Sequence, residues 1–149
     1  MRRVDALLAD YASYHRTRGN LVCHTFGITL IVFGVVAMLL AVRLPGRAAV
    51  TAAEVVIAAA FLFYLTLDVS LAAAMLAELA LFDAAGRTVG DWRAGLAAFA
   101  LGWVFQGVGH ARFEKNRPAL FKNLVHLLVG PLFLLNELLH IRRIESLSD

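Results

Sequence analysis

The sequence has a single cysteine, Cys23, and few charged residues. One cysteine cannot form an intramolecular disulfide, so a disulfide-stapled scaffold is excluded. Charged residues make up 17% of the chain and hydrophobic residues 60%, whereas soluble domains have roughly 25% charged and 45–50% apolar residues. This composition also excludes intrinsic disorder. A chain of 149 residues with a mean hydropathy of +0.73 cannot bury so many apolar side chains away from water, so lipid is expected to cover part of its surface.

The motifs of several common catalytic sites are missing as well. There is no Gly-x-Ser-x-Gly nucleophile elbow, no His-Glu-x-x-His zinc motif and no Cys-x-x-Cys pair. The clustered histidine boxes of membrane di-iron hydroxylases and desaturases are absent, and so is a phosphate-binding glycine-rich loop before a helix. What remains for chemistry is a dispersed set of histidines and acidic residues.

Basic residues are in slight excess, with a net charge of +3 and a pI near 9.5. Such a charge is also found in nucleic-acid-binding proteins. Most of these residues are arginines at the ends of apolar runs, where anchoring and orientation of a membrane protein are the commoner explanation. We therefore expect membrane lipid, and no nucleic acid, as a partner.

Long apolar runs dominate the sequence after a polar segment at residues 1–20. The first run is long enough to cross a hydrocarbon core of roughly 30 Å at about 1.5 Å per residue. Asp68 is expected to mark a tight turn between the second and third runs, and a loop is expected over residues 83–93. The predicted apolar helices span residues 21–42, 48–67, 69–82, 94–109 and 119–141.

The predicted fold class is therefore all-α, with residues 1–149 forming one membrane-embedded domain. We expect an integral membrane helical bundle with four to five transmembrane or re-entrant helices. The re-entrant alternative concerns residues 69–82, a run that is short for a full crossing. The preference for arginine over lysine, together with many alanines, is associated with bacteria and points to a bacterial inner membrane. Formation of a homo-oligomer stays open.

Polar residues in or beside apolar helices are informative, because they are costly there and usually face a protein interior or a cavity. Asn20 and His24 are one helical turn apart, so they share a face near one membrane interface. The alternative is that Asn20 caps the helix and His24 reaches out to the headgroups. Both interpretations stay open at this point.

A second group of polar and aromatic residues follows the spacing i, i+3, i+7, i+10 and i+11: Trp103, Gln106, His110, Phe113 and Glu114. They form one helical stripe provided that the glycines between them do not break the helix. His110 and Glu114 can offer a nitrogen and a carboxylate to one cation, a donor set that suits zinc or ferrous iron. Gln106 can hydrogen-bond a liganding histidine or a bound substrate. The alternative is a surface pair at the interface, with Trp103 in the aromatic belt.

Further candidates lie around and after this stripe. Arg112 and Arg117 either anchor the chain at the headgroups or hold a lipid carboxylate or phosphate. Glu137 is a candidate buried acid, and it lies about three turns after His126, so these two are not expected to bind one ion together. The dispersed groups come together only if the helix over 21–42 packs against the helix over 94–109.

A resemblance to a known family rests on two blocks of residues. They are Tyr14-His15 with Asn20 and His24, and Gly102-Trp103-x-x-Gln106-x-x-Gly109-His110-x-x-Phe113-Glu114-x-x-Arg117-Pro118-Ala119-Leu120-x-x-Asn123-Leu124. The chain resembles the yeast-type Fe(II)-dependent 2-hydroxy fatty acid dioxygenases, which act in the metabolism of phytosphingosine to odd-numbered fatty acids. Pro131 and Glu137 extend the resemblance into the last run, so it covers nearly the whole chain. Thr29 and the absence of Asn-Pro within residues 16–19 depart from the family pattern.

The resemblance implies α-oxidation, in which a 2-hydroxy fatty acid and dioxygen give a fatty acid one carbon shorter. The implied cofactor is Fe(II), and no 2-oxoglutarate is consumed. The implied partners are a 2-hydroxy fatty acid, dioxygen and membrane lipid. Two other interpretations stay open: a non-catalytic lipid-binding or assembly factor, and another histidine-metal membrane enzyme containing haem or zinc.

The family's site residues carry over to matching positions of this chain. The implied iron ligands are His15, His24 and His110. Glu114 and Glu137 would complete this ligand shell or orient the histidines. His126 is only a secondary ligand candidate, because the yeast member has Gln instead of a histidine at this position. The residues expected to act in catalysis are Glu114, Gln106, Arg112 and Arg117.

Overall fold

The computed structural model describes residues 2–46, 50–114 and 125–142, and these residues are mostly helical. The elements are α1 (Arg3–Ser13), α2 (Arg18–Leu40), α3 (Ala52–Leu65), α4 (Val69–Val89), α5 (Trp92–Val108), the π-helix η1 (Gly109–Glu114) and α6 (His126–Leu139). Within the described ranges, extended pairing is confined to a single bridge between Arg43 and Thr51. The all-α prediction is confirmed. Residues 119–124 of the last predicted run lie outside the described residues.

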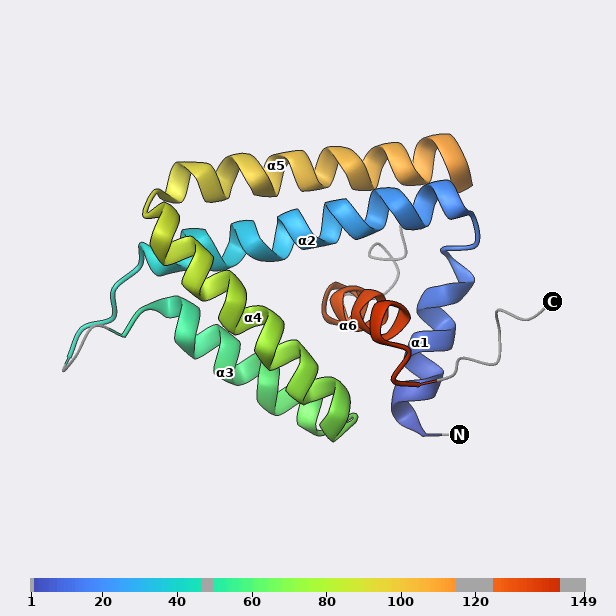
Figure 1. Ribbon diagram of the computed structural model, residues 1–149, viewed down its shortest axis with the longest axis horizontal. Helices are drawn as coiled ribbons and strands as arrows, with labels where there is room; N and C mark the ends of the chain where they lie inside the picture. Colours follow the sequence, from blue (N-terminus) through green and yellow to red (C-terminus); the bar gives the residue numbers. More distant parts are fainter. Residues whose placement is uncertain (1, 47–49, 115–124, 143–149) are drawn as a thin grey trace.

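Helices α2 and α5 lie side by side along their whole length, as Figure 1 shows. The contact is lined by glycines at seven-residue spacing, two helical turns apart on each helix: Gly27 and Gly34 on α2, Gly95 and Gly102 on α5. A Cβ atom at Gly102 would lie 2.6 Å from the carbonyl oxygen of Gly27, and one at Gly34 would lie 2.5 Å from that of Gly95. The two backbones therefore approach closely because side chains are missing between them. We call these four residues the glycine seam.

The polar segment at residues 1–20 contains a helix, α1, that is not among the predicted apolar helices. Helix α1 buries Val4, Leu8, Tyr11 and Ala12, which follow the i, i+4, i+7, i+8 spacing of one helix face. It packs against α6. Charged residues beside this face, such as Asp5 and Asp10, make the segment look polar as a whole, although its buried face is apolar. This helix places the residue that follows it, His15, inside the protein.

Helices α3 and α4 form an antiparallel pair joined at Asp68 (Figure 1), so the predicted turn is confirmed. The carboxylate of Asp68 accepts hydrogen bonds from the first backbone N–H groups of α4. The loop predicted over residues 83–93 is wrong for most of its length, because α4 continues to Val89. In this last part of α4, Arg87 forms a salt bridge of 2.7 Å with Asp83, one turn earlier. Gly90, with φ of +66°, then ends the helix.

The end of α6 is tied to two other elements by one arginine. Arg142 donates hydrogen bonds to Asp5 of α1 at 2.7 Å and to Asp68 at 2.8 Å. The side chain of Asn136 holds the backbone of Arg142 through both its oxygen and its nitrogen. These contacts fix α6 against α1 and against the turn between α3 and α4.

Two of the described helices, α2 and α4, are long and apolar enough to cross a membrane. Helices α3 and α6 have 14 residues each and α5 has 17. A helix of 14 residues is about 21 Å long, short of the roughly 30 Å of a hydrocarbon core. By length and composition, two of the described helices could therefore cross a membrane, and the four to five crossings that we expected are not confirmed.

Candidate metal centre

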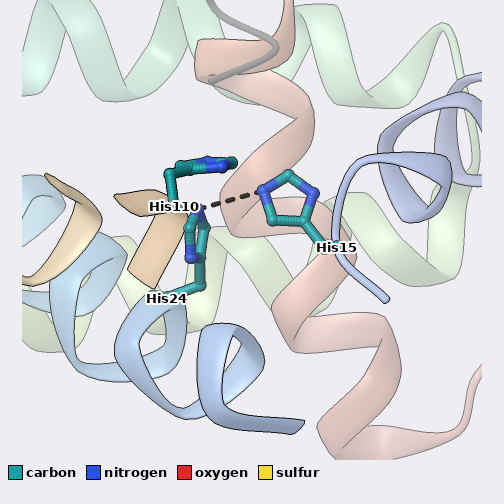
Figure 2. Close-up of side chains that lie close together, drawn as sticks. All are labelled: His15, His24 and His110. Atoms are coloured by element: carbon teal, nitrogen blue, oxygen red, sulfur yellow. Dashed lines mark hydrogen bonds between the residues drawn. The ribbon is translucent and has the colours of Figure 1, made fainter. Parts of the chain in front are cut away.

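Three histidines from different elements converge at one end of the α2–α5 pair, as Figure 2 shows. His15 follows α1, His24 lies in the second turn of α2, and His110 lies in η1. Each is buried, with exposed fractions of 5%, 2% and 3%. One ring nitrogen from each histidine lies within 4.8 Å of the other two. We call these residues the three-histidine cluster. The condition for bringing these residues together, packing of the helix over 21–42 against the helix over 94–109, is met by α2 and α5, which bring His24 and His110 together.

The backbone fixes the tautomers of two of the three rings. Nδ1 of His15 lies 2.8 Å from the carbonyl oxygen of Tyr11, and Nδ1 of His24 lies 3.0 Å from that of Asn20. Because a carbonyl oxygen can only accept, each Nδ1 carries the hydrogen and donates it. Each neutral ring then presents a lone pair at Nε2. These two Nε2 atoms are only 3.0 Å apart.

Burial disfavours the charged forms of His15 and His110. Desolvation lowers the pKa of His15 to about 4, against the hydrogen bond to Tyr11, which raises it. Desolvation also lowers the pKa of His110. At neutral pH no additional proton is therefore available to lie between the facing Nε2 lone pairs of His15 and His24. Two such lone pairs repel each other unless a cation lies between the rings.

The cluster fits a metal ion on these grounds. Two nitrogens bound at right angles to one cation, each at about 2.1 Å, would be about 3.0 Å apart. Metal-binding histidines usually donate their second ring N–H to a carbonyl or carboxylate, as His15 and His24 do. Nδ1 of His110 is buried and has no hydrogen-bond partner among the described residues. Three imidazole nitrogens suit iron, zinc or copper, and the role of these residues as ligands stays a prediction.

Glu114 lies beside the cluster with one carboxylate oxygen engaged elsewhere. Its Oε1 accepts hydrogen bonds from the backbone N–H groups of Arg16 at 2.6 Å and Thr17 at 2.8 Å, and from the side chain of Asn20 at 3.2 Å. Desolvation raises the pKa of Glu114, but these hydrogen bonds outweigh it and lower the pKa overall. The carboxylate thus lies at the positive N-terminal end of α2. It joins η1 to the segment that carries His15.

A cavity of about 80 Å³ opens beside the three histidines. Gln106 and Trp103, which precede His110 by one and two turns, line it together with Ile28 of α2. The predicted helical stripe is thus present up to His110. Beyond it, the helix continues as the π-helix η1, and the ring of Phe113 lies against Gly19. A single π-helical turn of this kind is frequent at functional sites.

His126 lies in the wall of the same cavity, paired with a residue that the sequence analysis missed. Its Nε2 is 2.8 Å from a carboxylate oxygen of Asp10, on α1. The rings of Tyr11 and Tyr14 pack edge-on against its imidazole. Asp10 could not be paired with His126 from the sequence, because the two residues are 116 positions apart.

The remaining candidates lie away from the cluster or outside the described residues. Glu137 is half-buried on α6, eleven residues or about 16 Å beyond His126. Arg112 is exposed on η1. Arg117 lies outside the described residues. No contact of Glu137 or Arg112 with the three histidines is found in the described part of the chain.

The two surface interpretations from the sequence are wrong. Thr17, not Asn20, caps α2, and its side chain accepts a hydrogen bond from the backbone of Asn20 at 3.3 Å. Asn20 and His24 are 0% and 2% exposed, so His24 does not reach outward to lipid headgroups. His110 is equally buried and cannot form a surface pair with Glu114. Tertiary packing of α5 and η1 over the start of α2 accounts for this burial.

Fold and site together define an all-α protein with a cluster of three buried histidines. The family described as 2-hydroxy-palmitic acid dioxygenase Mpo1-like matches residues 1–142. The 2-hydroxy-palmitic acid dioxygenase MPO1 of Saccharomyces cerevisiae is 37% identical over 136 residues, covering 89% of this chain and 77% of the yeast protein. The chain therefore belongs to the Mpo1-like family. No solved structure matches it.

Proposed function

We propose that this protein is an Fe(II)-dependent dioxygenase that converts 2-hydroxy fatty acids to fatty acids one carbon shorter. The observation that carries the proposal is the pair of Nε2 lone pairs of His15 and His24, fixed 3.0 Å apart beside a third buried histidine. Membership of a family whose yeast relative is named a dioxygenase supports iron over zinc, because zinc has no redox chemistry. His15, His24 and His110 would hold the iron, which supplies the activation of dioxygen when bound.

The proposed reaction needs no additional reductant. A 2-hydroxy acid and dioxygen balance against the shorter acid, carbon dioxide and water. Oxidation of the substrate, with loss of its carboxyl carbon, supplies the four electrons that reduce dioxygen. We therefore propose that 2-oxoglutarate is not consumed.

Residues of the cavity would bind the two ends of the substrate differently. The head group would lie beside His110 and Gln106, which are polar and buried. The acyl chain would follow Ile28, Ile31 and Val32, which line the cavity and lie on α2 at i+4, i+7 and i+8 from His24. The last of these residues, Val32, lies about 12 Å from His24 along the helix axis, so the side chains line a path of that length away from the cluster. Arg112 and Arg117 stay candidates for holding the substrate carboxylate.

We further propose that the protein is embedded in a membrane, the bacterial inner membrane if its source is bacterial. Only 33% and 28% of the apolar windows of α2 and α4 are buried within the protein, so much of each window is at least partly exposed. Large apolar side chains are exposed along other helices as well, including Leu62 of α3 and Val104 of α5. Surface of this kind is typical of contact with lipid.

The test is turnover of 2-hydroxypalmitate by protein purified without oxygen and loaded with Fe(II). We expect dioxygen uptake and formation of pentadecanoate in equal amounts without added 2-oxoglutarate. Variants His24→Ala and His110→Ala should lose both. Full turnover in either variant, or activity with zinc in place of iron, would contradict the proposal. A protein that binds no metal and converts no substrate would instead favour a non-catalytic lipid-binding protein.

A further inference from the structure

The pair formed by Asp10 and His126 stands apart from the three-histidine cluster but borders the same cavity. The side chain of Asp10 is 51% exposed, whereas that of His126 is 3% exposed. Because a carboxylate can only accept, Nε2 of His126 carries a hydrogen and donates it to Asp10 at 2.8 Å. When the ring carries this hydrogen alone, Nδ1 of His126 is a hydrogen-bond acceptor.

This acceptor has no partner within the described residues, although it is buried. The edge-on rings of Tyr11 and Tyr14, with centroids 5.6 Å and 5.9 Å from that of His126, hold the imidazole in place. A buried acceptor without a donor is unfavourable. It is therefore expected to pair with a donor that enters the cavity.

We propose that Nδ1 of His126 accepts a hydrogen bond from the hydroxyl group of a 2-hydroxy acid and thereby selects it over the acid without that hydroxyl. The inference rests on the function proposed above. At neutral pH a carboxylate has no hydrogen to donate, whereas a hydroxyl group has one, so the acceptor matches only the hydroxyl end of the head group. An acid without the hydroxyl leaves the nitrogen unpaired and is disfavoured for that reason.

In this arrangement Asp10 is a positioning residue that acts through His126. By holding the hydrogen on Nε2, its carboxylate keeps Nδ1 free to accept. His126 is not needed as an iron ligand, because the donor atoms that lie within 4.8 Å of one another belong to the other three histidines in the described part of the chain. If His126 binds only the acid, its substitution leaves the iron content unchanged. If His126 were an iron ligand, its substitution would lower the iron content.

The experiment measures equilibrium binding of two acids to the Fe(II)-loaded protein in detergent without oxygen. The acids are 2-hydroxypalmitate and palmitate, and the variants are His126→Phe, His126→Gln and, as a control on the exposed end of α6, His140→Asn. We expect His126→Phe to weaken binding of the hydroxy acid about tenfold and leave binding of palmitate and iron content unchanged. His126→Gln, whose amide oxygen can accept, should restore part of the preference. His140→Asn should change neither.

A measurement on the wild-type protein keeps the test independent of how the variants fold. In 2-methoxypalmitate the hydroxyl hydrogen is replaced by a methyl group, so this acid should bind as weakly as palmitate. The proposal is overturned if the methoxy acid binds as tightly as the hydroxy acid. It is also overturned if His126→Phe loses iron, or weakens both acids equally. If the wild type converts 2-hydroxypalmitate but His126→Phe keeps the full preference for the hydroxy acid over palmitate, this inference alone fails. If the wild type neither binds nor converts 2-hydroxypalmitate, the proposed function fails as well.

Discussion

At the scale of single residues, the backbone one turn earlier in the chain fixes which ring nitrogen of His15 and His24 is available to bind a metal ion. Each ring donates Nδ1–H to the carbonyl oxygen four residues before it, that of Tyr11 or Asn20. Such a contact is local, so each imidazole is oriented by its own segment of the chain. Tertiary packing then has only to bring the two Nε2 atoms together.

Glu114 connects the segments that carry two of the histidines, and its substitution tests this role. Glu114→Ala removes the acceptor that holds the backbone of Arg16 and Thr17, next to His15. We expect iron affinity to fall by about 10- to 100-fold, because groups that orient metal ligands typically contribute this much. Glu114→Gln should lose less, since its amide oxygen can still accept two backbone hydrogen bonds. Competition with a chelator measures the affinities.

Asp83→Asn is the matched control for this loss of negative charge. Asp83 pairs with Arg87 on α4 and belongs to no element of the cluster. We expect the iron affinity of this variant to equal that of the wild type. Equal losses in the Asp83 and Glu114 variants would show that overall charge, and not the position of the carboxylate, sets the affinity.

Single residues also show which parts of the candidate site could be predicted from the sequence. His110 and Gln106 could be placed on one helix face from their spacing, and the structure puts both in the wall of one cavity. The role of Glu114 could not be found in this way, because the N–H groups that it accepts from are almost a hundred residues earlier in the chain. Asp10 was missed for the same reason, since its partner His126 is 116 residues away.

At the scale of elements, the glycine seam sets how closely α5 approaches α2. Gly102→Ala would place a Cβ atom 2.6 Å from the carbonyl oxygen of Gly27, a backbone atom that cannot rotate away. The helices would have to separate, so we expect a loss of about 1–3 kcal/mol in the free energy of unfolding. Iron affinity should fall too, because His24 and His110 lie on the two separated elements. Thermal unfolding in detergent, with and without Fe(II), measures both effects.

The chain offers a matched control in the same helix. Nothing lies within 4 Å of a Cβ atom added at Gly107. Gly107→Ala is therefore expected to be neutral or to stabilise the protein by up to about 1 kcal/mol through helix propensity. If both alanine variants behaved alike, close approach at the seam could not be what positions the histidines.

Element boundaries were predictable where they depend on local capping and unpredictable where they depend on packing. Asp68 caps α4 with its own carboxylate, so its turn could be found from the sequence. Gly86 and the charges near it predict a loop, yet Gly86 is buried where α4 meets Leu40 of α2. The π-helical turn at η1 was also beyond sequence reasoning, because the helix continues there against the weak propensity of Gly107 and Gly109.

At the scale of the whole molecule, exposed apolar side chains predict where lipid contacts the protein. Leu81 lies near the middle of α4 and is 65% exposed. In a bilayer, Leu81→Lys should cost about 2.5–3.5 kcal/mol and lower the fraction of chains that insert. Leu44→Lys is the control, because Leu44 follows α2 and is 39% exposed outside the helices. Resistance to alkaline carbonate extraction measures insertion, and release of the wild-type protein by carbonate would contradict a membrane location.

The central claim about the molecule is that three histidines, distant in sequence, bind one metal ion. Metal stoichiometry after purification without oxygen, with Fe(II) supplied, tests it most directly. We expect about one iron per wild-type chain and per chain of the His140→Ala control. We expect almost no iron in each of His15→Ala, His24→Ala and His110→Ala. Retention of wild-type iron content by any of these three variants would contradict it.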